Sequence, residues 1–316
     1  MPVSARVGPV DRPNHQRPTL YLVDASLYVF RAWHSMPDDF RDAEGWPTNA
    51  VHGFARFLLE LLERERPTHI VVAFDEAHAS CFRNALYPAY KANRDAAPEE
   101  LRHQFAWCKS LCSALGLAVL AHDEYEADDL IGTALHVARG NGYRGIIVSA
   151  DKDLSQLLDD HDEQWDYARN QRWGAAGVRA RHGVHAHQIA DYLALCGDVV
   201  DNIPGVSGIG CKTAAGLLAH FGSLDALLAR VEEVPFLRLR GAGQIAAKLR
   251  AQREQVLLYR QLSTIALDAP LHDGAPPFAR TAALAQPLKE LCETLRFGPL
   301  TRRRLHTAAG LEFVPT

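Results

Sequence analysis

Three acidic residues crowd the stretch YEADD, residues 125–129, where Glu126, Asp128 and Asp129 fall within four consecutive positions. No lysine or arginine lies within five positions of any of them. Carboxylates this close together repel one another, so solvent, distant basic side chains or a bound cation must stabilise them. A bound cation would give the stretch a chemical role. The positions of the other acids help to decide among these three explanations.

Further acids occupy equivalent places along the chain. Asp24 and Asp75 end two short apolar runs, and Asp151 and Asp153 follow another. Ligands of an open α/β sheet bind beyond the carboxyl ends of its strands, so these side chains and the YEADD acids should converge on one crevice. The alternative is that each acid is an ordinary helix cap or turn residue, which explains one such position better than it explains seven.

A cluster that offers only carboxylate oxygens suits the hard divalent ions Mg²⁺ and Mn²⁺, whereas zinc would favour histidine or cysteine. More than about four carboxylates predicts two ions, as in nucleases and polymerases. The predicted substrate is therefore a phosphodiester. The six cysteines show neither a CxxC pair nor zinc-ligand spacing, so we expect neither a zinc site nor a disulfide.

The elements that must hold these acids follow from the apolar pattern. Short, nearly continuous apolar runs are typical of strands buried on both faces of a parallel sheet, and they lie at residues 19–26, 69–75, 117–122 and 145–151. Apolar residues at helical spacing lie between them, at residues 50–65, 98–116 and 126–142. Strand and helix alternate, which predicts a doubly wound α/β domain with a mostly parallel sheet.

After about residue 185 the pattern changes to short helices with Gly/Pro-rich joints, and LSTIAL, residues 262–267, is the one candidate strand. This composition predicts a small helical domain. The predicted organisation is a disordered extension at residues 1–18, a metal-dependent α/β domain at 19–185, a helical domain at 186–275 and a C-terminal tail at 276–316.

A second pair of acids, Asp198 and Asp201, directly precedes the loop NIPGVSGIG. Gly208 and Gly210 leave backbone amides uncovered where a helix is expected to start near Lys212, a favourable place for a phosphate. This arrangement predicts a helix–hairpin–helix motif, with an ordinary helix–helix turn as the alternative. A nucleotide-binding P-loop is disfavoured because the lysine comes one position too late and a helical segment precedes the loop.

A gap of 22 residues, 76–97, separates the second predicted strand from the next helix, where two to six residues are usual. It carries Arg83, Lys91 and Arg94, interleaved with aromatic residues that include Tyr90. Basic and aromatic side chains above a metal site fit phosphate neutralisation and base stacking. An ordinary surface excursion is the alternative.

The overall charge allows a nucleic-acid partner. The formal net charge is −4, but it becomes +5 once the nine acids of the two clusters are set aside as metal ligands. Such a surface would steer a polyanion modestly and in a salt-sensitive way. The chain has no signal-peptide core and no apolar run of 18 residues, so we expect a cytoplasmic protein without a membrane segment.

Together these stretches resemble the 5′-nuclease family, which comprises the N-terminal domain of bacterial DNA polymerase I, phage 5′-exonucleases and flap endonucleases. The likeness covers residues 19–270. Its motifs are LVDASLYVFRAWH (22–34), PTHIVVAFD (67–75), FRNALYPAYKANR (82–94), EADDLIGT (126–133), SADKDLSQLL (149–158) and GDVVDNIPGVSGIGCKTA (197–214). The resemblance implies a PIN-like fold, a helical arch built from the long gap, and a helix–hairpin–helix domain.

The resemblance also implies roles for individual residues. Two Mg²⁺ ions, for which Mn²⁺ could substitute, would be held by two groups of acids, with Asp129 acting through water. The first group is Asp24, Asp75, Glu126 and Asp128, and the second is Asp151, Asp153, Asp198 and Asp201. Lys91 and Arg94 would hold the scissile phosphate from the arch, and Arg31 from below. Residues expected to contact DNA are Arg83, Tyr90, His52, Ser207, Gly208, Gly210 and Lys212, with a potassium ion at the hairpin carbonyls.

Two positions depart from the family pattern. Cys211 stands where an acidic or small polar residue is common, and His52 stands where an aromatic residue is common. His52 is expected either to stack on a base or to be a partly exposed helix residue.

The predicted function is metal-dependent 5′→3′ exonuclease and flap endonuclease activity on DNA with 5′ flaps, nicks or 5′ ends, in replication or repair. RNA primers and a DNA polymerase are further expected partners of what would be a free-standing nuclease. The rival functions are a DNA-junction binding protein with a degenerate metal site and a PIN-type ribonuclease.

Overall fold

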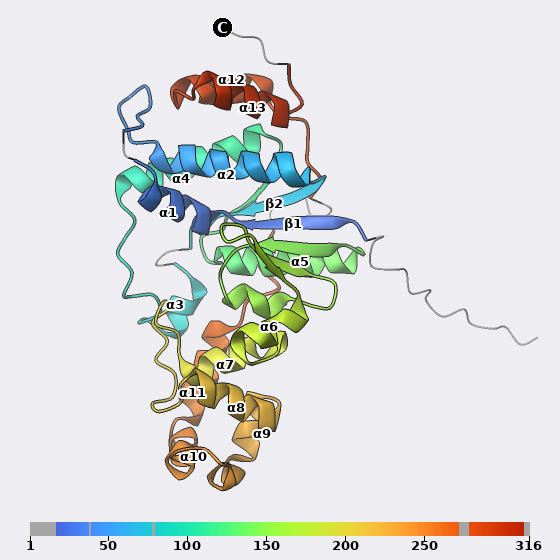
Figure 1. Ribbon diagram of the computed structural model, residues 1–316. Helices are drawn as coiled ribbons and strands as arrows, with labels where there is room; N and C mark the ends of the chain where they lie inside the picture. The colour runs from blue at the N-terminus through green and yellow to red at the C-terminus, as the bar shows by residue number, and fades with distance from the viewer. Residues whose placement is uncertain (1–16, 38, 78–79, 272–277, 313–316) are drawn as a thin grey trace, which may run out of the picture.

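A computed structural model describes residues 17–37, 39–77, 80–271 and 278–312 (Figure 1). A six-stranded sheet of order β3-β2-β1-β4-β5-β6 forms its centre. The strands are β1 Thr19–Asp24, β2 His69–Ala73, β3 Ala118–Leu120, β4 Arg144–Val148, β5 Glu163–Asp166 and β6 Gln171–Trp173. Every neighbouring pair is parallel except β5 and β6. The predicted α/β class and mostly parallel sheet are therefore confirmed.

Successive residues of β1 face opposite sides of the sheet, as the two-residue period of a strand requires. Leu20 and Leu22 belong to the core on the side of α5, Ala127–Gly140. Tyr21 and Val23 belong to the core on the other side. That side is covered by α1 Ala25–Ser35, α2 Asn49–Glu65 and α4 Glu99–Ala114 (Figure 1).

The helical part follows β6 and lies below the sheet in Figure 1. Its α-helices are α6 Ala175–His182, α7 Ile189–Cys196, α8 Cys211–Phe221, α9 Leu224–Ala229, α10 Ala242–Ala251 and α11 Arg253–Ser263. Short 3₁₀ turns connect them, η3 Ala186–Gln188 and η4 Val231–Phe236, and a further one, η2 Asp153–Leu157, follows β4. The buried residues of this part join those of α5 and of one sheet face in a single apolar cluster.

The C-terminal residues, which the sequence pattern left unassigned, form α12 Ala285–Thr294 and α13 Pro299–Ala308. Leu288, Leu291 and Leu305 of this pair are buried in the same core as α2 and α4. In Figure 1 the two helices form the layer farthest from the helical part. They add a second layer of helices on the side of the sheet that α1, α2 and α4 cover.

Several predicted elements differ from the structure. Strands β5 and β6 were not predicted. The sequence of β5, EQWD, is not an apolar run. Its Gln164 is nevertheless fully buried, because the side-chain amide donates to the Ser149 and Asp151 carbonyls. The segment LSTIAL contains the end of α11 and an irregular stretch, and no strand. In the described part of the expected arch, residues 76–77 and 80–97, the helical content is the single helix α3, Phe82–Leu86, followed by turns.

Most of the predicted disordered extension, residues 1–18, lies outside the described residues, which begin at residue 17. All six cysteines lie inside them and are free thiols, as predicted. Among the helices of the described ranges, none has both the length and the apolar character needed to cross a bilayer.

Candidate functional site

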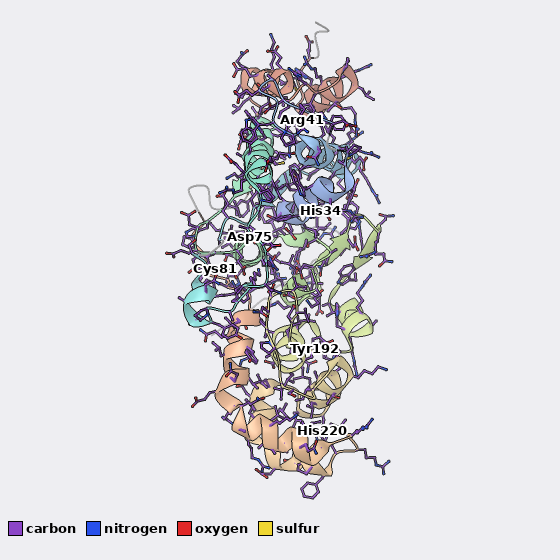
Figure 2. The ribbon with its side chains drawn as sticks, turned by 90° about the vertical axis from the view of Figure 1, so that its left-hand side faces the viewer. His34, Arg41, Asp75, Cys81, Tyr192 and His220 are labelled. Carbon is purple, nitrogen blue, oxygen red and sulfur yellow. The ribbon has the colours of Figure 1, made fainter. Side chains whose placement is uncertain are left out.

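The acids gather where the order of the sheet reverses. The chain moves from β1 to β2 and β3 on one side and then places β4 on the other side of β1, which opens a crevice at the carboxyl ends of these strands. Asp24 ends β1, and Asp151 follows β4 by three residues. Figure 2 shows Asp75, which follows β2, at mid-height in the molecule, between His34 of α1 and the helical part.

The first group of acids surrounds Asp24, which is 7% exposed. The Ser149 hydroxyl donates to Asp24 Oδ2 at 2.8 Å, and the Leu27 N–H donates to Oδ1 at 3.2 Å. Burial, with Asp151 and Asp75 nearby, raises the pKa of Asp24 to about 6. Burial also raises the pKa of Asp128 well above its usual value, with further contributions from Asp151 and Asp24. These carboxylates therefore lie close enough to disfavour one another's charge.

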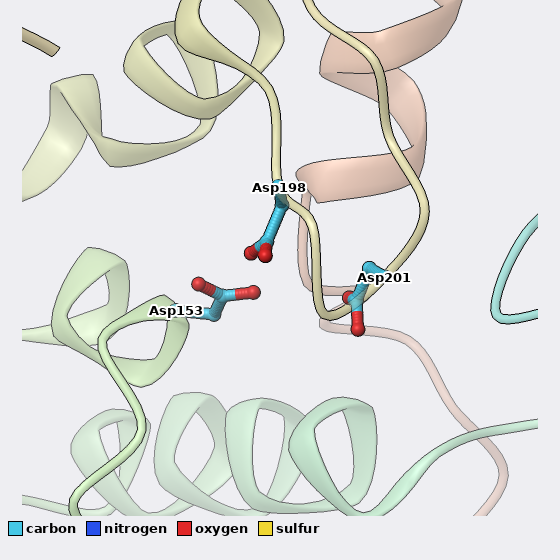
Figure 3. A group of neighbouring side chains, drawn as sticks. All are labelled: Asp153, Asp198 and Asp201. Carbon is cyan, nitrogen blue, oxygen red and sulfur yellow. The ribbon is translucent and has the colours of Figure 1, made fainter. Parts of the chain in front are cut away.

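The second group is Asp153, Asp198 and Asp201, whose carboxylate oxygens lie within 4.8 Å of one another. Asp153 starts η2, and the other two lie in the turn that follows α7. Figure 3 shows the Asp153 and Asp198 carboxylates pointing toward each other. Burial and the charge of Asp151 raise the pKa of Asp153 to about 8. Three oxygen donors at this spacing can hold a hard divalent cation.

Asp151 connects the two groups. Its negative charge raises the pKa values of Asp24, Asp128 and Asp153, and its Oδ1 accepts the Asp153 N–H at 2.9 Å. Acids from five separate segments thus form one continuous centre, with Asp151 in the middle.

Lys152 supplies positive charge to the second group and was not singled out from the sequence. Its Nζ lies 2.6 Å from Asp198 Oδ2 and 3.3 Å from Asp153 Oδ1. Asp153 Oδ1 is buried and accepts no hydrogen bond from the described residues, so the ion pair with Lys152 does not satisfy it fully. An oxygen in that position is suited to a cation.

Asp129 and Arg83 do not have the roles predicted for them. Arg83 is 2% exposed and donates to both Asp129 oxygens at 2.7 Å and to Glu126 Oε2 at 3.1 Å. Asp129 is fully buried and also accepts the Ala266 N–H at 2.8 Å. Arg83 is therefore unavailable to DNA, and Asp129 is engaged by the protein itself. Arg83 thus compensates two of the three acids of the crowded YEADD stretch, Glu126 and Asp129.

Tyr90 also departs from its predicted role. It is 3% exposed, and its hydroxyl lies 2.9 Å from Glu126 Oε2 and 3.1 Å from Asp201 Oδ2. A ring buried to this extent has no free face for a base, so the prediction of a DNA contact is wrong. The hydroxyl instead joins an acid of α5 to an acid of the helical part.

Lys91 and Arg94 lie against the acids, as their predicted positions require. Lys91 Nζ forms an ion pair with Glu126 and lies 3.8 Å from Asp201 Oδ1. Arg94 donates to the same Asp201 oxygen at 2.8 Å and is 44% exposed. Burial raises the pKa of Glu126, but Lys91 and Arg83 outweigh it and hold that pKa below its usual value. Arg31 is an exposed residue of α1.

His52 lies on a different face of the molecule. Its ring stacks on Phe40 at 4.5 Å and packs on Phe297 at 4.6 Å between ring centroids, and Nε2 is 3.0 Å from the Leu295 carbonyl. These contacts tie α2 to the segment between α12 and α13. Its half-buried position on α2 agrees with the alternative prediction of a partly exposed helix residue. Packing on Phe40 and Phe297 leaves less of the ring free for the predicted base contact.

The hairpin between α7 and α8 has the predicted exposed features. Gly208 has φ +91°, Gly210 is the N-cap of α8, and Lys212 in its first turn is exposed. Lys248 of α10, which sequence reasoning missed, donates from Nζ to the Ser207 carbonyl at 2.7 Å. Lys248 lies 41 positions from Ser207 in the sequence, so the local pattern around the hairpin gave no indication of this contact.

Comparison with known families decides the identity of this fold and site. Residues 19–183 match the family described as 5′-3′ exonuclease, N-terminal resolvase-like domain, and residues 184–283 match the one described as 5′-3′ exonuclease, C-terminal SAM fold. The chain belongs to the 5′-3′ exonuclease family. The family and the class of enzyme inferred from the motifs are thereby confirmed.

Relatives of the chain include two DNA polymerases I. The one from Rhizobium leguminosarum is 38% identical over 291 residues, 90% of this chain and 28% of that protein. The one from Pseudomonas aeruginosa is 42% identical over 253 residues, 80% of this chain and 28% of that protein. The chain thus spans less than a third of the length of these relatives.

Solved structures show the same fold. T5 5′-exonuclease with bound divalent metal ions (zinc) has a TM-score of 0.65 at 18% identity, covering 93% of this chain and 99% of that one. The catalytic core of Rad2 in complex with a DNA substrate has a TM-score of 0.63 at 16% identity, covering 95% and 94%. At sequence identities this low, the likeness shows a shared fold only.

Proposed function

We propose that this chain is a divalent-metal-dependent 5′→3′ exonuclease and flap endonuclease that hydrolyses DNA phosphodiesters. The observation that carries the proposal is the continuous acidic centre, in which Asp151 lies between a group around Asp24 and the group Asp153, Asp198 and Asp201. Membership of the 5′-3′ exonuclease family supports it. Two proteins of the same fold, T5 5′-exonuclease with bound zinc ions and the catalytic core of Rad2 in complex with DNA, are consistent with it.

The donor set fits divalent cations. Burial and mutual repulsion raise the pKa values of Asp24, Asp128 and Asp153, and a bound cation would remove that penalty on the charged forms. Because every donor is a carboxylate oxygen, Mg²⁺ is the proposed ion and Mn²⁺ its substitute. When bound, two such ions would generate a hydroxide nucleophile and stabilise charge on the phosphate.

We assign the metal-holding residues from the resemblance and the geometry together. Asp24, Asp75, Glu126 and Asp128 would hold one ion, and Asp153, Asp198 and Asp201 the other. Because Asp151 raises the pKa values of both Asp24 and Asp153 and its Oδ1 accepts the Asp153 N–H, we propose it as a ligand shared by both ions. Lys152 and Ser149 would orient these ligands, because they contact Asp198 and Asp24 directly.

The chain's own cations would bind and orient the phosphate. Lys91 and Arg94 lie at the acidic centre, and the arrival of a phosphate offers them a second anion to bind. Arg31, on the exposed part of α1, is proposed to contact the same strand. The hairpin residues Ser207, Gly208, Gly210 and Lys212 are proposed to grip the duplex backbone.

Other features of the function rest on the resemblance. The potassium ion at the hairpin is one of them, and the Ser207 carbonyl at that loop already accepts from Lys248. RNA primers as substrate, a polymerase partner and a cytoplasmic location stay predictions in the same way.

Cleavage of labelled DNA tests the proposal. The purified protein is incubated with 5′-flap, nicked and single-stranded DNA, and with single-stranded RNA, in Mg²⁺, Mn²⁺ or EDTA. We expect metal-dependent release of 5′ fragments from the flap and nicked DNA. Metal-dependent cleavage confined to RNA would identify a PIN-type ribonuclease, and tight binding of the flap DNA without cleavage would identify a junction-binding protein. Either result would refute the proposed activity.

A further inference from the structure

The turn that carries Asp198 and Asp201 depends on its last residue, Asn202. Two backbone hydrogen bonds close the turn, from Asp198 N to the Ile203 carbonyl at 2.7 Å and from Ile203 N to the Asp198 carbonyl at 2.8 Å. Asn202 adopts φ +57°, in the left-handed region that asparagine tolerates better than most residues. The direction in which Asp201 points is thus tied to the conformation of its neighbour.

The arch segment, residues 89–94, lies against this turn. The hydrogen bonds between them run from Asn202 Nδ2 to the Ala89 carbonyl at 2.6 Å, from Lys91 N to the Asp201 carbonyl at 3.1 Å, from Asn93 Nδ2 to the Val199 carbonyl at 2.9 Å and from Arg94 Nε to the Val200 carbonyl at 3.3 Å. All four acceptors are backbone carbonyls, and side chains supply three of the four donors, so the two segments, more than 100 residues apart, are joined mainly by side-chain to backbone hydrogen bonds.

Lys91 adopts a strained backbone conformation where the arch segment meets the turn. Its φ is +53°, which is uncommon for a long side chain and costs free energy unless neighbouring contacts stabilise it. Its N–H is held by Asp201, and two positions earlier the Ala89 carbonyl is held by Asn202. The ammonium that pairs with Glu126 is thus placed by contacts from the opposite segment.

We propose that Asn202 is a positioning residue for the nuclease reaction: through its side-chain amide it fixes the arch segment, and with it Lys91, relative to Asp198 and Asp201. The inference rests on the proposed function, because the two sets of groups must act on one phosphate. An error of about 1 Å in such a placement can reduce turnover on the order of 100-fold.

Two substitutions separate the amide from the backbone conformation. Asn202→Gly keeps access to the left-handed conformation and removes the amide, whereas Asn202→Ala removes both. We expect Asn202→Gly to lower kcat on flap DNA by roughly 10- to 100-fold with little change in KM. Turnover equal to the wild type in Asn202→Gly, with a loss in Asn202→Ala alone, would show that only the backbone matters and would overturn the proposal.

Asn170 provides the matched control. It is an exposed asparagine with φ +50° at the turn between β5 and β6, and it contacts Arg64. Asn170→Gly makes the same chemical change away from the acids, and we expect it to leave turnover unchanged. A loss in this variant equal to that of Asn202→Gly would remove the specificity on which the proposal depends.

A double-mutant cycle tests whether Asn202 acts through Lys91. If it does, Asn202→Gly should cost little further activity in a Lys91→Ala background, because the group to be positioned is absent. Full additivity of the two losses would contradict the proposal.

Hydrogen exchange provides a readout that does not depend on cleavage. The Lys91 amide, which donates to Asp201, should exchange about tenfold faster in Asn202→Gly than in the wild type. Unchanged exchange would overturn the inference even if turnover fell. A wild-type protein that cleaves no substrate would refute the proposed function instead, and this exchange measurement would still decide the role of Asn202 in fixing the arch segment.

Discussion

Replacing Arg83 by methionine distinguishes an arginine that binds DNA from one that supports the fold. In the structure its guanidinium is 2% exposed and pairs with Asp129 and Glu126. It also donates to the Leu262 and Thr264 carbonyls. Removing one partner from a buried ion pair costs about 3–5 kcal/mol, because the remaining charge is left without compensation. Asp129 is fully buried, so we expect Arg83→Met to fall in this range.

The expected loss is a large part of the stability of an ordinary domain, which is about 5–15 kcal/mol. It corresponds to a fall in Tm on the order of 10 °C for a chain of this size. Thermal and urea unfolding of the two proteins would measure it. Arg304→Met is the matched control, because Arg304 pairs with both Glu63 oxygens at 2.8 Å on the exposed surface. Exposed pairs contribute about 0–1 kcal/mol.

The two interpretations of Arg83 give opposite results. A DNA-binding arginine would leave Tm unchanged and reduce the salt dependence of binding by about one phosphate contact. A supporting arginine lowers Tm, and binding measured well below the new Tm keeps its salt dependence. Equal stability of Arg83→Met and the wild type would refute the ion-pair reasoning.

Three further predictions concern the acidic centre. Asp151→Asn removes a proposed metal ligand, so it should reduce cleavage at least about 100-fold and leave flap-DNA binding, measured by fluorescence anisotropy, within about threefold of the wild type. Asp268→Asn, on the exposed surface, is the control and should match the wild type. Cleavage at a normal rate by Asp151→Asn would contradict the assignment. Lys91→Ala should lower kcat by about 10- to 100-fold with little change in binding, and rapid-quench kinetics showing unchanged chemistry would exclude its role at the phosphate. Burial raises the pKa of Asp24 to about 6 and the pKa of Asp153 to about 8. Above about pH 4 these two groups therefore hold more protons in the folded protein than in the unfolded chain, so their contribution to stability in EDTA should fall as pH rises toward about 8. Mn²⁺ should remove most of this fall in Tm, and a metal-free protein whose Tm rises over the same range would contradict the sign.

Much of the site could be predicted because its chemistry coincides with regular sequence features. Asp24, Asp75 and Asp151 follow apolar strands, and the carboxyl ends of parallel strands meet at one edge of the sheet. The pair Asp198 and Asp201 was recognisable from the glycine-rich hairpin beside it. These positions depend on the order of elements, which apolar periodicity reveals.

The errors concern residues whose partners are distant in sequence. Arg83 and Tyr90 lie in a basic, aromatic segment. Nothing in that segment shows that Arg83 would be buried in an ion pair with Asp129, or that the buried Tyr90 hydroxyl would contact Asp201. His52 was open to two predictions because the segment between α12 and α13, which packs on its ring, carries no recognisable motif. For Arg83 and Tyr90, burial by long-range contacts overrides the local pattern. Composition alone cannot distinguish a buried cation from one that awaits a ligand.

The single apolar cluster that unites one face of the sheet with the helical part has a mechanical consequence. Neither part can swing away from the other without bringing buried leucines into water, at about 25 cal/mol for each Å² exposed. In a nuclease of the proposed kind, the hairpin that grips the duplex would therefore be held at a constant offset from the acids. The number of nucleotides between the bound duplex and the cleaved bond would then be fixed by the packing of the folded core.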